Sequence, residues 1–334
     1  MEDMRDDPIP AFTAPARVLL AAPRGYCAGV DRAIDIVEVA LATYGPPVYV
    51  RKQIVHNLHV VRKLEAKGAV FVEELEQVPR GATVVFSAHG VAPEVHRQAA
   101  ARDLRVIDAT CPLVTKVHQE ARKFAAKGYD IVLVGHEGHE EVVGTMGNAP
   151  GVVHLIADEQ DAGQVQVADP GRVAYLTQTT LSVDETSGVV DALRRRFPVL
   201  AGPRSDDICY ATQNRQAAVK ALARQCQLVL VIGAENSSNS KRLVEVARNS
   251  GCASHLVAEA SAVDPAWFEG VETVGVTSGA SAPEWLVDEL VAALRQRGAS
   301  EVREVEVVPE DVHFALPGTL RRDAEAARSG QAGG

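Results

Sequence analysis

The chain has 334 residues, of which 46% are hydrophobic and 23% charged, as is ordinary for a water-soluble globular protein. A formal net charge of −10 and an aromatic content of only 4% argue against a nucleic-acid-binding surface, which needs basic patches and stacking side chains. No apolar stretch approaches the length that crosses a membrane, and the acidic N-terminus lacks the apolar segment of a secretory signal. We therefore expect a cytoplasmic protein with reduced thiols and with neither a nucleic-acid nor a membrane partner.

The first elements of the chain surround Cys27. Residues 1–16 contain several prolines and predict a mobile leader. Residues 18–22 form a short apolar run typical of a buried strand, and a helical pattern over 31–42 follows a break that contains proline and glycine. Cys27 therefore lies at the carboxyl end of a strand, just before a helix. Open α/β sheets bind ligands at such points, and a helix dipole favours a thiolate there.

Two further cysteines occupy the same local setting. Cys111 follows the strand pattern that begins at residue 105 and precedes a helical pattern that ends at Gly128. Cys209 precedes the helical pattern that contains Ala218 and Leu222. The three cysteines are 84 and then 98 residues apart, which indicates an internal repeat.

Two other strands in each repeat also end in polar side chains. After the first of them, expected at 48–50, 131–134 and 228–232, come His56, His139 and Asn239. After the second, expected at 84–88, 173–176 and 274–278, come His89, Thr179 and Ser281. The polar residues recur with nearly the same spacing as the cysteines. Packing three separate cores does not require this match, so we expect these strand tips to share a function.

The repeat predicts three α/β units at residues 17–110, 111–205 and 206–297. Strands alternate with helices throughout, so the sheets should be parallel and covered on both faces. For residues 298–334 we expect a last strand near 301–308, returning to an earlier unit, and a disordered tail that is poor in large apolar residues.

The repeated cysteines admit a specific use. None forms a C-x-x-C pair, which disfavours thiol–disulfide exchange and the usual zinc sites. Three widely spaced thiolates suit an iron–sulfur cluster with one iron left open to substrate. Cys226 and Cys252 fall outside the repeated setting, and we interpret both as packing residues.

The polar tips predict an anion site and a proton donor. Hydroxyl, amide and imidazole groups suit a diphosphate. The predicted donors are His56, His89, His139, Ser237, Ser238, Asn239 and Ser281. For the serines, capping of a helix is a rival interpretation. With an ordinary imidazole pKa, binding should tighten below a pH of roughly 6 to 7. Glu141 is the one carboxylate at a repeated tip and a candidate general acid, with Thr179 and Thr180 as candidate proton relays. Glu140 is interpreted as a surface residue.

These segments resemble the 4-hydroxy-3-methylbut-2-enyl diphosphate reductases, the family that ends the non-mevalonate isoprenoid pathway. The similarity extends over nearly the whole chain, from about Val18 to Leu316. It rests on the segments PRGYCAGVDRAI, VHN, FSAHGV, DATCPLVTKVH, GHEGHEEVVGTMG, TQTTLSVDET, DDICYATQNRQ, NSSNSKRL and TSGASAPEWLV. Tyr26 stands where the family often has phenylalanine, which is a mild change.

The resemblance implies a trefoil of three pseudo-symmetric α/β units around a central cavity. It implies a [4Fe–4S] cluster ligated by Cys27, Cys111 and Cys209, with the fourth iron taking the substrate hydroxyl. It further implies that the histidine, serine and asparagine tips hold the diphosphate and that Thr179 and Glu141 lie near the hydroxyl. The reaction would be reductive dehydroxylation to isopentenyl and dimethylallyl diphosphate, with electrons from an external donor such as ferredoxin or flavodoxin.

Two other functions fit the cysteines. An iron–sulfur hydro-lyase acting on a small phosphorylated substrate would use the open iron only as a Lewis acid, and it would need no reductant. A cluster-bearing sensor without catalytic activity should lack tight binding of an allylic diphosphate.

Overall fold

The computed structural model describes residues 13–331. Internal contacts divide the chain into two compact units: a smaller unit of residues 13–27 and 210–311, and a larger unit of residues 28–209 and 312–331. The mobile leader predicted for 1–16 lies outside the described residues, apart from its last four. Within the described part, no helix is both long and apolar enough to cross a membrane.

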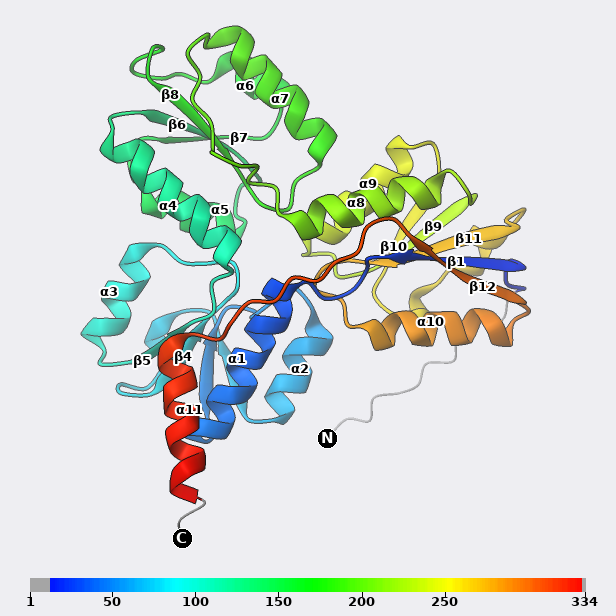
Figure 1. The fold of residues 1–334 in the computed structure, drawn as a ribbon, viewed down its shortest axis with the longest axis horizontal. Coiled ribbons are helices and arrows are strands. Elements are labelled where there is room, and N and C mark those ends of the chain that lie inside the picture. The colour runs from blue at the N-terminus through cyan, green and yellow to red at the C-terminus, as the bar shows by residue number, and fades with distance from the viewer. Residues whose placement is uncertain (1–12, 332–334) are drawn as a thin grey trace. The chain divides into compact units, whose positions relative to one another are not determined.

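The larger unit contains two parallel sheets (Figure 1). The first has the strand order β3-β2-β4-β5, with strands β2 (Val48–Arg51), β3 (Ala69–Val72), β4 (Thr83–Phe86) and β5 (Arg105–Asp108). Its helices are α1 (Ala28–Tyr44), α2 (Leu58–Ala66), the short 3₁₀ helix η1 (Leu75–Gln77) and α3 (Pro93–Ala101).

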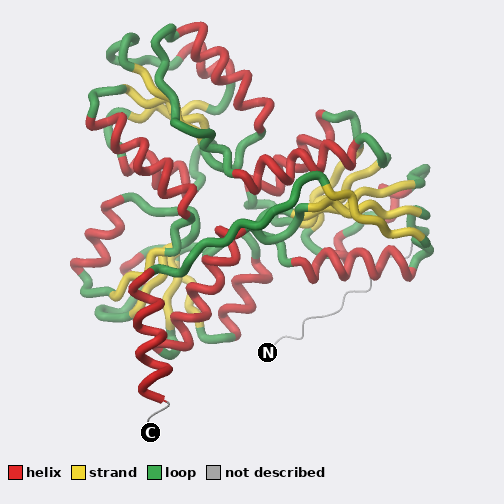
Figure 2. Tube along the Cα trace, viewed as in Figure 1, coloured by secondary structure: helices red, strands yellow, loops and turns green. Residues whose placement is uncertain are grey.

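The second sheet has the order β7-β6-β8. Its strands are β6 (Asp130–Val134), β7 (Val153–Ile156) and β8 (Val173–Thr177). The accompanying helices are α4 (Pro112–Ala126), α5 (Glu140–Asn148), α6 (Glu159–Gln164) and α7 (Val183–Arg196). Figure 2 shows the sheets in yellow with helices in red beside them, as the alternation of patterns in the sequence predicts.

The smaller unit contains the third sheet, which has the order β10-β9-β11-β1-β12. Its strands are β1 (Arg17–Ala22), β9 (Leu228–Ile232), β10 (Ala253–Val257), β11 (Thr273–Ser278) and β12 (Glu301–Glu306). Its helices are α8 (Tyr210–Ala223), α9 (Ser238–Asn249), η2 (Ala260–Ala262), η3 (Pro265–Phe268) and α10 (Glu284–Gln296).

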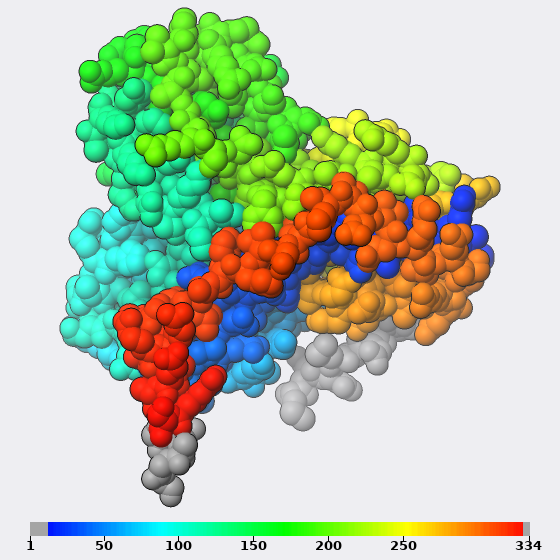
Figure 3. Space-filling model, in the orientation of Figure 1, coloured from blue at the N-terminus to red at the C-terminus, as the bar shows by residue number. Residues whose placement is uncertain are grey.

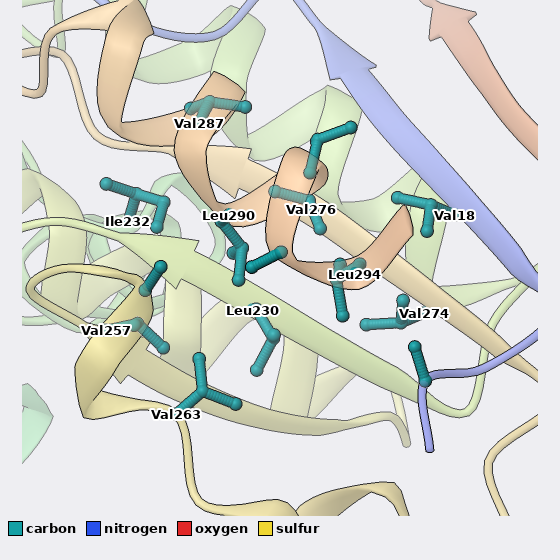
Figure 4. Packing of buried hydrophobic residues seen from close by; sticks show 14 of the residues in the cluster. Val18, Leu230, Ile232, Val257, Val263, Val274, Val276, Val287, Leu290 and Leu294 are labelled. Atoms are coloured by element: carbon teal, nitrogen blue, oxygen red, sulfur yellow. The ribbon is translucent and has the colours of Figure 1, made fainter. Parts of the chain in front are cut away.

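One core of the smaller unit lies between α10 and the third sheet (Figure 4). Val287, Leu290 and Leu294 recur at helical spacing along α10 and are at most 1% exposed. They share this core with Leu230 of β9 and Val18 of β1. Each such burial contributes roughly 1.5–3 kcal/mol before the entropic cost of ordering the side chain. The core fixes the sheet whose carboxyl ends carry the polar tips.

All three sheets share one strand order. The first strand of each repeat (β2, β6 or β9) lies between the other two. The second strand (β3, β7 or β10) lies on one side of it, and the third (β4, β8 or β11) lies on the other. Within residues 13–331, the neighbouring strands of these sheets are parallel. All of these strands run in the same direction, but the second and third strands lie on opposite sides of the first. This change of side creates the switch point at which α/β sheets bind ligands. The predicted α/β class with parallel sheets is confirmed, and the trefoil arrangement stays a prediction.

The predicted boundary at residue 17 is wrong for β1. This strand belongs to the third sheet, where Val18 pairs with Val274 of β11 and with Val302 of β12. β1 thus occupies beside β11 the place that β5 occupies beside β4 in the first sheet. Each cysteine therefore lies at the end of a repeat and not, as predicted, at its beginning. A period in the sequence fixes the length of a repeat but not its starting point, and the pairing of β1 with strands more than 250 residues away has no local signal.

The prediction of a disordered tail is also wrong for most of that segment. Residues 318–331 form helix α11 (Gly318–Gln331), which packs against α1 within the larger unit (Figure 3). Leu320 is buried, and Tyr44 Oη donates a hydrogen bond of 2.7 Å to Asp323 Oδ2. Alanine, arginine and glutamate are strong helix formers, so one buried leucine suffices where a low apolar content had suggested disorder. Residues 332–334 lie outside the described part.

Candidate active site

The three repeated cysteines stand at equivalent places. Cys27, Cys111 and Cys209 are half-buried, free of disulfide bonds, and directly precede α1, α4 and α8. The backbone N–H of Cys27 donates to the carbonyl of Ala280 over 3.3 Å. That of Cys111 donates to Ala88 over 2.9 Å, and that of Cys209 donates to the carbonyl of Thr179 over 3.0 Å. Each cysteine is therefore anchored to the tip of the third strand of its own sheet.

This anchoring brings the cysteines together with the predicted polar tips. Ala88 directly precedes His89, Ala280 directly precedes Ser281, and Thr179 is itself a predicted site residue. Within each compact unit, a thiol and a polar side chain of the predicted set thus lie on bonded loops.

The loop before Cys27 requires glycine. Gly25 has a φ of +69°, and its N–H donates to Ser278 Oγ over 2.8 Å. A Cβ at this position would lie 3.2 Å from a carboxylate oxygen of Glu284, which pairs with Arg24. The left-handed backbone and the close approach explain the Arg-Gly-Tyr-Cys order of this segment.

Cys226 and Cys252 lie in a core of the third sheet, as predicted. Their sulfur atoms are 4.0 Å apart. Burial and the neighbouring thiol raise the pKa of Cys226 to about 12, and burial raises the pKa of Cys252 as well. These thiols stay protonated and are poor metal ligands.

Three histidines converge in the larger unit. The rings of His56 and His89 stack with centroids 4.0 Å apart, and the ring of His139 approaches them edge-on at 5.4 and 5.8 Å. Burial lowers the pKa of His56 and of His139 to about 4, and burial with the two neighbouring rings lowers the pKa of His89 well below its usual value. The expected tightening of binding below pH 6 to 7 is therefore wrong, because these imidazoles are already neutral at that pH in the free protein.

Neutral rings are still donors. His139 caps the N-terminus of α5, where its Nδ1 accepts the N–H of Glu141 over 3.2 Å. The neutral ring therefore carries its proton on Nε2, which is available to a ligand. The Nδ1 of His89 is buried and has no hydrogen-bond partner among the described residues. A buried imidazole nitrogen of this kind is costly unless a ligand or water satisfies it.

Glu141 and Thr179 form a buried pair. Glu141 is 2% exposed, and its two carboxylate oxygens accept the Thr179 N–H over 2.7 Å and the Thr179 hydroxyl over 3.0 Å. Burial raises the pKa of Glu141 to about 7, although the Thr179 bonds oppose the shift. Near neutral pH this carboxyl is therefore able both to hold and to release a proton. Glu140 instead lies near Lys52 and Arg51 at the surface, and Thr180 Oγ1 accepts the amide of Gln178.

The serine and asparagine tips have structural roles as well. Ser237 caps α9 by accepting the N–H of Ser240 over 3.3 Å, which confirms the capping interpretation for this residue. Asn239 Oδ1 accepts the N–H of Ala280 over 2.8 Å, and its Nδ2 donates to Thr212 Oγ1 over 3.3 Å. Asn239 thus supports the same Ala280 whose carbonyl anchors the Cys27 loop.

The three repeated cysteines offer the type of ligand that an iron–sulfur cluster uses. Among residues 13–331, no three His, Cys, Asp or Glu side chains are grouped so as to hold one metal ion. In a cluster each thiolate binds its own iron, so its ligands need not converge on one atom. Three half-buried thiols that form no disulfide, at helix N-termini where thiolates are favoured, meet the chemical requirement for such ligands.

Sequence reasoning missed three cations that bind the cysteine loops. Arg32, Lys116 and Arg215 donate to main-chain carbonyls just before the cysteines. These cations follow Cys27, Cys111 and Cys209 by five, five and six residues, and this recurrence could have identified them in the sequence.

Three parallel sheets with polar groups at their switch points, and with thiols on loops bonded to those points, define a ligand-binding α/β protein. Residues 18–295 match the family model described as LytB protein. The chain is 64% identical over 311 residues to the 4-hydroxy-3-methylbut-2-enyl diphosphate reductase of Acidothermus cellulolyticus, a match that covers 93% of this chain and 92% of that protein. It is 60% identical over 314 residues to the reductase of the same name from Streptomyces avermitilis, covering 93% of each chain.

Solved structures agree with the sequence matches. The structure of E-1-hydroxy-2-methyl-but-2-enyl-4-diphosphate reductase from Plasmodium falciparum is similar with a TM-score of 0.91 and 36% identity, and the match covers 94% of this chain and 99% of that one. The chain belongs to the LytB family, and it is an oxidoreductase.

Proposed function

We propose that this oxidoreductase converts 4-hydroxy-3-methylbut-2-enyl diphosphate to isopentenyl and dimethylallyl diphosphate. The C–O bond to the hydroxyl breaks, two electrons and two protons enter, and water leaves. The identity of the relatives supports the substrate. The observation that carries the chemistry is the pair formed by Glu141 of α5 and Thr179, whose carbonyl also anchors Cys209.

The proposed cofactor is a [4Fe–4S] cluster with Cys27, Cys111 and Cys209 as its ligands. When bound, such a cluster supplies electrons and an iron open to the substrate hydroxyl. The chain contributes three half-buried thiols, each held by a main-chain hydrogen bond from its own N–H. Pre-set loops of this kind lower the cost of ordering the ligands when the cluster binds.

Glu141 is the proposed proton donor. A hydroxyl leaves slowly unless it is protonated, and general acid catalysis of this kind is typically worth ~10² to 10⁴-fold. A pKa of about 7 keeps a substantial fraction of Glu141 in its acid form at neutral pH. In this proposal the Thr179 hydroxyl, which donates to the carboxylate over 3.0 Å, orients the leaving group or relays the proton.

The proposed diphosphate site uses uncharged donors. His56, His89 and His139 are neutral at pH 7, so each offers one N–H and no positive charge. Ser237, Ser238, Asn239 and Ser281 supply hydroxyl and amide donors. The N-termini of α5 and α9, which begin at these tips, add backbone N–H groups and a favourable dipole. Holding the non-reacting end of the substrate in this way orients its reacting carbon.

Turnover by anaerobically purified protein tests the proposal. We expect the electron donor in the cytoplasm to be a reduced ferredoxin or flavodoxin, which a strong chemical reductant replaces in the assay. Turnover should give both products and should depend strictly on the electron donor. Product formed without a reductant would instead indicate the hydro-lyase. A protein that holds a cluster but neither binds nor converts the allylic diphosphate would be the sensor.

A further inference from the structure

A buried arginine holds the loop before Cys27. Arg215 lies on α8, and its side chain is fully buried. Its Nε and Nη2 donate to the carbonyl of Gly25 over 3.1 and 2.7 Å, and Nη2 also donates to the carbonyl of Tyr26 over 3.1 Å. Glu310 pairs with the same guanidinium at 3.1 Å. The two residues that directly precede Cys27 thus depend on one compensated cation.

A second arginine holds the loop before Cys111 in the same way. Arg32 lies on α1, and its Nη1 donates to the carbonyls of Ala109 and Thr110 over 3.2 and 3.1 Å. Its Nε donates to the carbonyl of Ala315 over 2.8 Å. The two residues that directly precede Cys111 thus accept hydrogen bonds from one guanidinium.

A lysine holds the loop before Cys209. Lys116 lies on α4, and its Nζ donates to the carbonyls of Ser205 and Asp206 over 2.5 and 2.9 Å. The same Nζ lies 3.1 Å from Oδ1 of Asp207, whose side chain is fully buried. All three N–H groups of this ammonium therefore have acceptors in residues 205–207, shortly before Cys209.

The three contacts form a closed series along the sequence. Each cation follows one cysteine by five or six residues, on the helix that begins there, and holds the loop of a different cysteine. The links run from Cys27 through Arg32 to Cys111, from Cys111 through Lys116 to Cys209, and from Cys209 through Arg215 to Cys27. Sheet packing does not require a cation at three matching places with this cyclic order.

We infer that these three cations are positioning residues that couple the three ligand loops to one another. The inference rests on the proposed cluster ligands. Main-chain carbonyls in a loop have no partner from a sheet ladder, and charge-assisted bonds are roughly twice as strong as neutral ones. Each helix is fixed at its start by one thiolate ligand and fixes the loop of the next. Retention of the cofactor is then cooperative: loosening one loop weakens the hold on the others.

The rate of iron release to a chelator tests this inference in the anaerobic holoprotein. Lys116 is the best position because its side chain is 26% exposed, so a neutral substitution is compatible with folding. For Lys116→Met we expect iron release roughly 10- to 100-fold faster than in the wild type, the usual effect of losing a partner behind a metal ligand. Lys116→Arg keeps the charge and should restore most of the retention. Lys123→Met, an exposed lysine on the same α4 helix, is the matched control and should release iron at the wild-type rate.

Mapping the released thiols by alkylation during chelation gives a second readout. Lys116→Met should expose Cys209 first, whereas Arg32→Met should expose Cys111 first. Far-UV circular dichroism establishes that each variant is folded. Release from Lys116→Met and Arg32→Met that equals the Lys123→Met rate, or the same cysteine exposed first in both, would overturn the inference. A wild-type chain that holds no iron–sulfur cluster would instead refute the proposed function, so the two failures are distinguishable.

Discussion

The third sheet contains cysteines in two environments, and their difference shows what makes a thiol chemically useful. Cys226 and Cys252 lie in the apolar core, where burial raises the pKa of Cys226 to about 12. Cys27 lies beyond the carboxyl end of β1, half-buried, with its N–H bonded to a strand tip and its loop held by a cation. Position relative to the strand, and not residue type, separates packing thiols from proposed ligands.

Serine substitution of the three repeated cysteines should produce the largest effect. Cys27→Ser, Cys111→Ser and Cys209→Ser should each abolish cluster assembly or activity, because an alkoxide is a poor replacement for a soft thiolate ligand. Visible absorption and turnover measured under anaerobic conditions report the loss. Cys226→Ser and Cys252→Ser are the matched controls and should keep both properties. A Cys226→Ser variant without a cluster, beside a Cys209→Ser variant that retains one, would reverse the comparison.

The acid at the tip of the second sheet should have the next largest effect. Glu141→Gln keeps size and hydrogen bonding but cannot release a proton, so we expect turnover at least ~10²-fold slower with the cluster intact. In the wild type, turnover should fall as the pH rises above about 7, where Glu141 loses its proton. Glu140→Gln, the control at the adjacent surface position, should be nearly silent. Near-normal turnover of Glu141→Gln with a strong reductant would remove Glu141 from the mechanism.

Asn239→Ala tests whether a polar tip serves the substrate, the cysteine loop or both. The substitution leaves the Ala280 N–H without its 2.8 Å partner, which should cost about 1–3 kcal/mol of folding stability. We also expect weaker binding of the diphosphate with unchanged visible absorption of the cluster. Titration with substrate and thermal unfolding measure the two effects. Unchanged substrate affinity with iron loss would make Asn239 a support for the Cys27 loop alone.

The smallest expected effect is a pH-dependent gain in stability for Glu141→Gln. The pKa of Glu141 is about 7 in the folded chain and ordinarily 4.5, so the folded state binds more protons between these values. Wild-type stability therefore falls as the pH rises from 4.5 to 7, and the penalty stays constant above pH 7. Glu141→Gln lacks this penalty, so its melting temperature should exceed that of the wild type at about pH 8 by more than at about pH 5. An equal difference at both pH values would contradict the buried-acid assignment.

Local patterns in the sequence were enough to predict much of the fold. Apolar runs bounded by polar or turn residues marked the strands that precede the polar tips, such as β4, β6, β9 and β11, because buried parallel strands are continuously apolar. The recurrence of cysteines and polar tips was visible as well, since both obey the same period. Glu141 stood out as the single carboxylate of this series.

Features that depend on contacts distant in the sequence were not predictable in this way. The place of β1 beside β11 and β12 arises from pairing across more than 250 residues. The lowered pKa of His56 and of His139 comes from enclosure by the fold, which composition does not reveal. Helix α11 depends on Leu320 and on the bond between Tyr44 and Asp323. Arg32, Lys116 and Arg215 looked like ordinary helix residues until their carbonyl partners were known.

The iron and acid-labile sulfide content of the anaerobically purified chain tests the central claim most directly. Three thiolates that each precede a helix are proposed to hold one cluster, so we expect about four iron and four sulfide per chain. The content should collapse in Cys111→Ser and remain at the wild-type level in Cys252→Ser. Iron without sulfide in the wild type, or the same content in both variants, would contradict the account.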